Sequence, residues 1–271
     1  MNIQTLISEQ APLIMGIINC TPDSFYEGSR QNLVEEALNR ARQMVSDGVH
    51  ILDIGGESSR PGSSYVSAEE EIRRVIPLIK AIRKEMKIPI SIDTRKESVA
   101  RAAVENGADI INDISALKDD PSLAVYAAKM DIPVILMHMQ GHPENMQENP
   151  YYENVVQSVK TELLAAAENA ILYGIKKDRI ILDPGIGFGK RQSDNIDLLK
   201  GIEELKKTDY PILIGLSRKR FLGNITGRDT EDRLAGTLAA NAFAMIQGAH
   251  ILRVHDVRET VDMVKVLREL T

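Results

Sequence analysis

Short runs of apolar residues recur along the chain, and polar residues follow nearly every one of them. Strands that are buried on both faces of a parallel sheet are nearly continuous in hydrophobic residues. The pattern therefore predicts eight buried parallel strands. They cover Ile14–Ile18, Val49–Ile54, Pro89–Ile92, Ile110–Ile111, Val134–Met137, Ile180–Leu182, Ile212–Leu216 and Ile251–Val254.

Between these strands, apolar residues return every three or four positions, as on a helix that packs one face against a sheet. The first helix spans Asn32–Asp47 and stops at Gly48. The second opens with Ser67 and Glu70, a capping-box pair, and Pro77 inside it should bend it. Further helices are expected at Glu97–Asn106, Pro121–Met130, Tyr152–Tyr173, Asn195–Lys207, Thr230–Gln247 and Val257–Leu270.

Eight strands that alternate with helices predict an α/β protein with a single (β/α)8 barrel, the TIM barrel. The length of 271 residues suits one such barrel, and no Pro/Gly/Ser-rich linker or charge block divides the chain. We therefore expect one domain over residues 1–271. An open doubly wound sheet is the alternative, but it usually has a glycine-rich turn after its first strand. Here that turn, Asn19–Phe25, contains no glycine.

Composition narrows the class of partner. The formal net charge of −6 argues against nucleic-acid binding, although local cations could still bind an anionic substrate. No apolar run approaches the ~18 residues of a membrane helix, so no membrane partner is expected. The single cysteine, Cys20, cannot form an internal disulfide, and no basic-then-apolar segment begins the sequence. These features indicate a reduced, cytoplasmic setting.

Polar residues at the strand ends predict one ligand site, because the C-terminal ends of all strands in a β/α barrel open onto one face. Three connections on that face, Cys20–Gln31, Gly55–Val66 and Gln140–Pro150, are longer than usual and suggest lids or binding loops. The polar residues at the strand ends are Asn19, Glu57, Asp93, Asn112, His138, Asp183, Ser217, Lys219, Arg253 and His255.

Cations among these residues point to a phosphate-bearing ligand. Arg60 lies in the second long loop, Lys219 follows the seventh strand, and Arg253 and His255 share a face at the end of the eighth. Charge-assisted hydrogen bonds to phosphate are strong, so the set suits a diphosphate. A buried Arg253 must be paired or liganded. The flanking residues Arg218 and Arg220 could equally be solvated.

Acids and amides at the strand ends suit a planar heterocycle. Asp93, Asn112 and Asp183 could meet a guanidine-like edge, because a carboxylate can accept two parallel N–H bonds. Capping of the following helices is the alternative reading. Phe188 lies within the glycine-rich segment 185–189, where it could cover a planar ring or anchor the loop. Asp53, inside a strand, is expected in a buried polar network.

Metal and covalent chemistry have weaker signals. The side-chain oxygen of Asn19 could contact Mg²⁺, which is held by few protein atoms together with substrate phosphates. Zinc is not expected, because the cysteine has no partner and the histidines lack metal spacing. His138 is interpreted as a packed barrel residue. Lys219 could in principle form an imine, but its arginine neighbours favour anion recognition.

Motifs at the strand ends resemble those of one family. Met15–Gly28, reading MGIINCTPDSFYEG, is similar to the first signature of bacterial dihydropteroate synthases. The resemblance spans essentially the whole chain, so it is highly specific. The further motifs, in the same order, are Asp53–Gly62 (DIGGESSRPG), Ile92–Thr94, Ile110–Ile114 (IINDI), Leu136–Gly141 (LMHMQG), Leu182–Lys190 (LDPGIGFGK), Gly215–Phe221 (GLSRKRF) and Gly248–Val257 (GAHILRVHDV).

The resemblance implies an enzyme that joins 6-hydroxymethyl-7,8-dihydropterin diphosphate to para-aminobenzoate, releasing diphosphate and forming 7,8-dihydropteroate for folate synthesis. It also implies a homodimer, Mg²⁺ as cofactor and para-aminobenzoate competition by sulfonamide drugs. The substrates are small molecules. The alternatives are a related barrel that passes a methyl group from methyltetrahydrofolate to a corrinoid protein, and a pterin-binding relative without catalysis. The first of these would not need the diphosphate cations.

The same resemblance assigns roles to single residues. Lys219, Asp93, Arg253 and His255 are the expected catalytic residues. Ser59 stands where the family often has Thr and keeps the hydroxyl, and Gly215 is counted with the substrate-binding residues. The pterin would contact Asp93, Asn112, Asp183 and Lys219, with Met137 and Phe188 packed near its ring. The diphosphate would contact Asn19, Arg60, Arg253 and His255, with Asn19 also at Mg²⁺. Para-aminobenzoate would contact Phe25, Pro61, Ser217 and Lys219.

The mechanism implied is dissociative, because an electron-rich dihydropterin can delocalise positive charge on the methylene that loses diphosphate. Cations and Mg²⁺ would stabilise the leaving group, and loop closure would exclude water from the cation. Ser24 and Phe25 are accordingly expected in a mobile loop.

Overall fold

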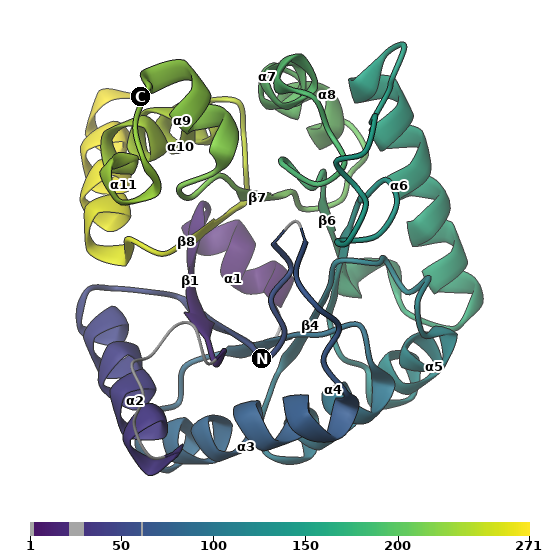
Figure 1. Cartoon of the computed structure of the whole chain (residues 1–271), viewed down its shortest axis with the longest axis vertical. Helices are drawn as coiled ribbons and strands as arrows, with labels where there is room; N and C mark the ends of the chain where they lie inside the picture. Colours follow the sequence, from purple (N-terminus) through teal and green to yellow (C-terminus); the bar gives the residue numbers. More distant parts are fainter. Residues whose placement is uncertain (1–2, 22–29, 61) are drawn as a thin grey trace.

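Eight parallel strands form a nearly closed barrel in the computed structural model, which describes residues 3–21, 30–60 and 62–271 (Figure 1). The strands pair in the order β6-β5-β4-β3-β2-β1-β8-β7, and a bridge between Leu182 and Ile212 joins the two outer strands. The predicted TIM barrel is confirmed. The strands are β1 (Leu13–Asn19), β2 (Ile51–Gly55), β3 (Ile90–Asp93), β4 (Ile110–Asp113), β5 (Val134–Met137), β6 (Ile180–Asp183), β7 (Leu213–Gly215) and β8 (Ile251–Val254).

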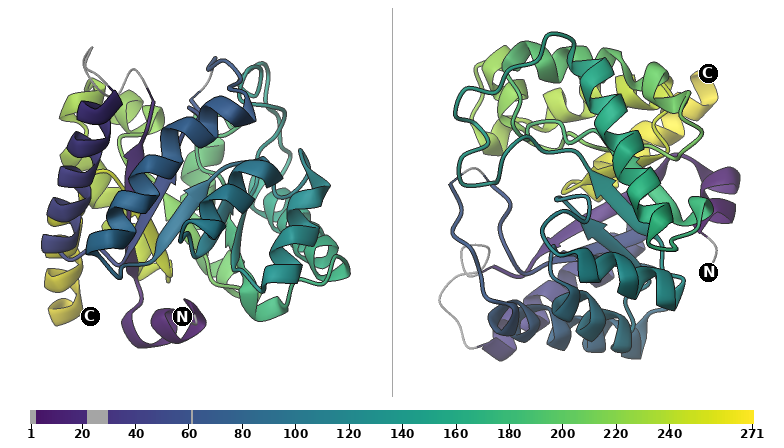
Figure 2. Two further views of the ribbon diagram at one scale, coloured as in Figure 1. Left: turned by 90° about the horizontal axis from the view of Figure 1, so that it is seen from below. Right: turned by 90° about the vertical axis from the view of Figure 1, so that its right-hand side faces the viewer.

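Helices surround the barrel, and α1 lies across one end of it (Figure 2). Ser67 caps α3 as expected, its hydroxyl accepting a hydrogen bond from the Glu70 N–H, and Pro77 lies inside that helix. The α-helices are α1 (Ile3–Gln10), α2 (Arg30–Ser46), α3 (Ala68–Glu85), α4 (Glu97–Glu105), α5 (Pro121–Met130), α6 (Val155–Leu172), α7 (Gln192–Lys200), α8 (Ile202–Lys206), α9 (Arg220–Thr226), α10 (Leu234–Ile246) and α11 (Val257–Leu270).

The structure corrects several predicted helix bounds. The single helix expected at Asn195–Lys207 is two helices that meet at Gly201, where a side chain would lie only 2.7 Å from Val156. The helix expected at Thr230–Gln247 begins with a 3-10 turn and becomes an α-helix only at Leu234. Helix α6 starts three residues later than predicted, because Asn154 caps it and accepts from the Gln157 N–H. Helices α1 and α9 were not predicted.

The barrel interior is apolar at one end and polar at the other. Side chains alternate across a strand, so residues two positions apart point to the same side. Ile51 in β2 is therefore followed inward by Asp53, and Ile251 in β8 by Arg253. The apolar layer is continuous with helix α1 and consists of Ile3, Ile7, Leu13, Met15, Ile51, Ile110, Ile135, Ile181, Leu213 and Ile251.

This apolar layer packs directly beneath the polar end of the barrel. A second and larger apolar cluster packs the outer faces of the strands against the helices. The interior layer closes the barrel beneath the polar end, so the polar side chains can only face the opposite opening. Among the described residues, no helix is long and apolar enough to cross a membrane.

Shortening a side chain in the apolar layer should destabilise the whole fold. Leu213 is fully buried, so Leu213→Ala should lower the free energy of unfolding by about 2–5 kcal/mol through lost burial and a residual cavity. Leu172→Ala is the matched control, because Leu172 is 86% exposed. Urea unfolding measures both. Equal effects in the two variants would contradict the packing described here.

Candidate active site

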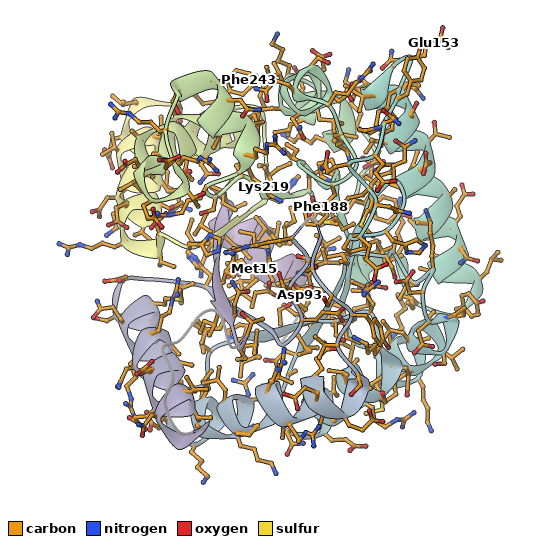
Figure 3. The ribbon with its side chains drawn as sticks, viewed as in Figure 1. Met15, Asp93, Glu153, Phe188, Lys219 and Phe243 are labelled. Atoms are coloured by element: carbon orange, nitrogen blue, oxygen red, sulfur yellow. The ribbon has the colours of Figure 1, made fainter. Side chains whose placement is uncertain are left out.

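The polar end of the barrel opens into a cleft of about 990 Å³. Asp93, Phe188 and Lys219 come from different parts of the chain yet lie near the centre of the barrel, whereas Glu153 and Phe243 lie at its periphery (Figure 3). Of the polar strand-end residues, His138 alone does not line the cleft. The cleft brings together every described residue to which the resemblance assigned a role: Asn19, Ser59, Arg60, Asp93, Asn112, Met137, Asp183, Phe188, Gly215, Ser217, Lys219, Arg253 and His255.

Phe25 and Pro61, predicted to contact para-aminobenzoate, lie outside the described residues, as does Ser24. The expectation of a mobile loop at Ser24 and Phe25 therefore remains a prediction. The roles assigned to the residues in the cleft also remain predictions, because the structure shows where their side chains lie and not what they bind.

Arg253 lies between two carboxylates at the base of the cleft. Its Nε donates to Asp53 Oδ2 at 2.6 Å and its Nη2 donates to Asp93 Oδ2 at 2.7 Å. Asp53 is fully buried, and Asn112 Nδ2 lies 3.4 Å from it. The buried polar network expected for Asp53 is thus present, and Arg253 is paired as its position requires. Asn112 uses its amide in this network and does not cap a helix through it.

This pairing determines the charges of the cluster. Burial raises the pKa of Asp93 to about 7, with Arg253 opposing the rise and Asp53 adding to it. Burial also works against the charge of Arg253, but Asp53 and Asp93 outweigh it and raise the Arg253 pKa above its ordinary value. The guanidinium stays charged, and Asp93 can exchange a proton near neutral pH.

Asp183 and Lys219 also line the cleft and interact electrostatically. Asp183 Oδ1 accepts a hydrogen bond of 2.7 Å from the Gly185 N–H, and burial raises the pKa of the carboxyl. Burial lowers the pKa of Lys219 to about 8, with Asp183 opposing the change. The Lys219 Nζ lies 4.1 Å from the centre of the Phe188 ring, a cation–π distance.

His255 and Ser217 contact each other at the end of β8. The Ser217 hydroxyl lies 3.0 Å from His255 Nδ1 and accepts from the His255 N–H at 3.2 Å. Burial, with Arg253 and Arg40 nearby, lowers the pKa of His255 to about 4. The ring is therefore neutral near pH 7 and can donate one N–H to an anion. Arg218, whose role the sequence left open, is paired with Asp256 at 2.8 Å.

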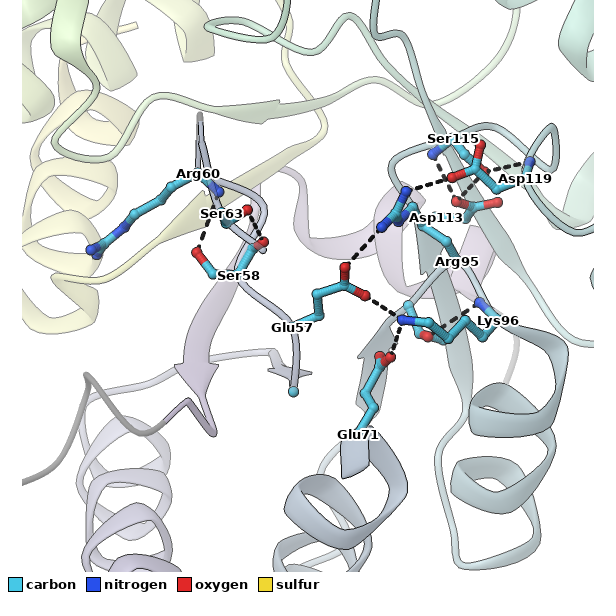
Figure 4. A network of polar contacts seen from close by, with 12 residues as sticks. Glu57, Ser58, Arg60, Ser63, Glu71, Arg95, Lys96, Asp113, Ser115 and Asp119 are labelled. Atoms are coloured by element: carbon cyan, nitrogen blue, oxygen red, sulfur yellow. Dashed lines mark hydrogen bonds and ion pairs between the residues drawn. The ribbon is translucent and has the colours of Figure 1, made fainter. Parts of the chain in front are cut away.

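A polar network fixes the start of the long loop after β2 (Figure 4). Glu57 receives a hydrogen bond of 2.8 Å from Arg95 and contacts Lys96, which also lies 2.7 Å from the buried Glu71. Arg60 points away from this network. Glu57 had no clear role in the sequence, and the structure gives it one as an anchor of the loop that carries Ser59 and Arg60.

The sequence analysis missed a buried lysine in the cleft wall. Lys190 is 3% exposed and follows directly on the glycine-rich segment 185–189. Its position immediately after a glycine-rich stretch was the one feature of the sequence that could have marked Lys190 as a candidate site residue. His138, interpreted as a packed residue, is also buried and contacts Lys190.

The donor set for a metal is small. Among the residues that the structure describes, no three His, Cys, Asp or Glu side chains gather into a metal cluster. Asn19 contributes a half-buried amide at the end of β1, in the cleft. One neutral oxygen fits an ion whose other ligands are phosphate oxygens and water, and does not fit a dedicated protein cage.

Comparison with known proteins identifies relatives over nearly the full length. The family model described as "Pterin binding enzyme" matches residues 15–255. A dihydropteroate synthase of Escherichia coli is 45% identical over 256 residues, 94% of this chain and 90% of that protein. A Xanthomonas albilineans dihydropteroate synthase solved with 7,8-dihydropteroate has a TM-score of 0.88 at 42% identity, covering 96% of this chain and 94% of that chain. A Yersinia pestis dihydropteroate synthase solved with a sulfonamide drug has a TM-score of 0.92 at 40% identity, covering 97% and 95%.

Removing the charge of Asp53 should make Asp93 more acidic. In Asp53→Asn the like charge that raises the Asp93 pKa is gone and Arg253 faces Asp93 alone, so the pKa should fall below about 7. Carbon-13 NMR titration of the Asp93 carboxyl measures it. Asp131, whose pKa Arg179 and Lys176 hold at about 2 on the surface, is the internal control and should not move. An unchanged or higher Asp93 pKa would show that the three groups are not coupled.

Proposed function

The chain belongs to the family of pterin-binding enzymes as a dihydropteroate synthase, and we propose that the strand-end residues of its cleft bind the pterin diphosphate and drive loss of its diphosphate. The reaction condenses 6-hydroxymethyl-7,8-dihydropterin diphosphate with para-aminobenzoate to 7,8-dihydropteroate and diphosphate, a step of folate biosynthesis. Sulfonamides target this enzyme. The relatives are synthases, which favours this activity over the corrinoid methyl transfer considered from the sequence.

Asp93, Asp183 and Lys219 come from three separate strand ends and yet line one cleft. This observation is the main support for assigning the pterin site to these residues. A pterin has a guanidine-like edge whose N–H groups can donate to a carboxylate. The buried Asp183 carboxylate accepts a single N–H, that of Gly185, from the described part of the chain, so it has acceptor capacity left for the pterin. Asn112 and the Lys219 ammonium add hydrogen-bonding groups around it, and Met137 and Phe188 supply apolar contact with the ring.

The diphosphate is assigned to the side of the cleft near β1 and β8. Asn19, Arg60, Arg253 and His255 line that cleft and offer two guanidinium groups, an imidazole N–H and an amide. Asn19 would also hold a divalent cation, Mg²⁺, that accompanies the phosphates. Such an ion, when bound, withdraws negative charge from the leaving diphosphate.

The proposed reaction needs little general acid–base catalysis from the protein. The bond between the pterin methylene and the diphosphate oxygen breaks first, and its electrons leave with the diphosphate. Arg253 and His255 stabilise that charge, and the dihydropterin delocalises the positive charge on the methylene. The para-aminobenzoate nitrogen then attacks from the direction of Ser217 and Lys219, the new C–N bond forms, and the nitrogen loses a proton. Exclusion of water protects the cation in the interval.

Three further expectations remain proposals. We propose a homodimer packed through outer helices, which the resemblance implied. A cytoplasmic location is proposed on the evidence of a single cysteine without an internal partner. The single-domain organisation over residues 1–271 also remains a proposal.

Removing the Lys219 ammonium should abolish most turnover. Diphosphate release on mixing both substrates with Mg²⁺ should fall by about 100- to 1,000-fold in Lys219→Ala, the loss typical when one preorganised donor is removed from a reacting site. Lys80→Ala, on the outer face of α3, is the control and should leave turnover unchanged. Near-normal turnover in a folded Lys219→Ala enzyme would defeat the assignment of this residue.

A further inference from the structure

Lys190 joins two loops at the rim of the cleft. Its Nζ donates to the backbone oxygens of Phe188 at 2.9 Å and His138 at 3.3 Å, and it lies 3.0 Å from His138 Nδ1. Phe188 belongs to the glycine-rich loop after β6, and His138 follows the end of β5. One buried amino group therefore bonds to both loops, and burial lowers its pKa to about 7. The proposed chemistry gives this group no task of its own.

The two loops are pressed together where Lys190 lies. Gly185 and Gly189 have φ values of 62° and 60°, the left-handed region that favours glycine. A Cβ on Gly185 would lie 1.9 Å from the His138 oxygen, and one on Gly189 would lie 2.5 Å from the Gln140 oxygen. Backbone carbonyls thus crowd this junction, and Lys190 Nζ donates a hydrogen bond to one of them, that of His138, as well as to the Phe188 carbonyl.

The imidazole ring of His138 turns its Nδ1 toward Lys190. Burial lowers the pKa of His138, so the ring is neutral, with one nitrogen an acceptor and the other a donor. His138 Nε2 lies 3.3 Å from the Glu162 carboxylate, which favours a proton on Nε2 and leaves Nδ1 to accept from Lys190. The Glu162 side chain is half exposed. A polar chain of three side chains therefore runs from the outer surface to the cleft wall.

The loop that Lys190 holds carries the groups assigned to the pterin. Phe188 places its ring beneath Lys219 Nζ, and the Gly185 N–H fixes one oxygen of Asp183. Met137, at the end of the neighbouring strand β5, directly precedes His138, and Phe188 packs against the apolar cluster that contains Met137. Fixing the β6 loop against the end of β5 therefore sets the separation between the Phe188 wall and the Met137 wall of the cleft.

We propose that Lys190 is a positioning residue that sets the width of the pterin slot by bonding the Phe188 loop to the end of β5. It acts through geometry and not as a cation for the diphosphate. This inference rests on the proposed function, because it takes the slot between Phe188 and Met137 to be the pterin site. It predicts that Lys190 controls pterin affinity and has little influence on para-aminobenzoate.

Lys190→Met, which keeps the length of the side chain and removes its donors, tests the proposal. The Michaelis constant for the pterin diphosphate should rise about tenfold, as the loss of hydrogen bonds to buried carbonyls predicts, while that for para-aminobenzoate at saturating pterin stays within about twofold. The dissociation constant of 6-hydroxymethylpterin, which lacks the diphosphate, should rise by the same factor when measured by calorimetry. Lys200→Met, an exposed lysine at the end of α7, is the matched control and should match the wild type in all three measurements.

Two results would overturn the proposal. Unchanged pterin binding in a folded Lys190→Met enzyme would show that the bonds to the two loops do not matter to the slot. Weakened binding of the diphosphate ester alone, with 6-hydroxymethylpterin unaffected, would make Lys190 an ordinary cation for the anion. If Lys190→Met does not fold, as thermal unfolding reports, Lys190→Leu, which also removes every donor, is held to the same two criteria. Failure of the wild-type enzyme to release diphosphate would instead refute the proposed function, so the two failures are distinguishable.

Discussion

Charged groups at the inward-facing end of a closed barrel must find partners, because an unpaired charge there is costly to bury. Arg253 meets this requirement by bonding to Asp53 and Asp93, from two other strands. The pairing arranges the rest of the site around it. It keeps the guanidinium charged and holds the Asn112 amide close to Asp53, while burial, opposed by Arg253, brings the pKa of Asp93 near neutrality. The apolar layer beneath leaves these groups only one direction to face, toward the cleft.

Much of this arrangement was predictable from strand periodicity. In a parallel strand with its interior face buried, the residue two positions after an apolar inward residue also points inward. The sequences Ile110-to-Asn112 and Ile181-to-Asp183 therefore predict inward polar side chains at the strand ends. Barrel closure then predicts that they meet, without knowledge of any distance. The described members of the predicted site do line one cleft for this reason.

Other features depend on contacts that no local pattern encodes. The Arg253–Asp53 bond joins residues 200 positions apart, and its partner choice follows from strand geometry across the barrel. The predicted helix over Asn195–Lys207 is two helices that meet at Gly201, where the close approach of Val156 leaves no room for a side chain. Lys190 was not predicted as a site residue because a lysine in a glycine-rich loop is usually solvated. Only the three-dimensional structure shows its hydrogen bonds to the carbonyls of His138 and Phe188.

A crystal structure of the enzyme with the pterin diphosphate and Mg²⁺ tests the central claim most directly, because that claim concerns where one ligand lies. The account predicts the guanidine-like edge of the pterin within hydrogen-bond distance of Asp183, its ring against Phe188, and its diphosphate beside Arg253 and His255. A pterin bound elsewhere on the barrel, or bound in the cleft with its edge away from Asp183, would contradict it.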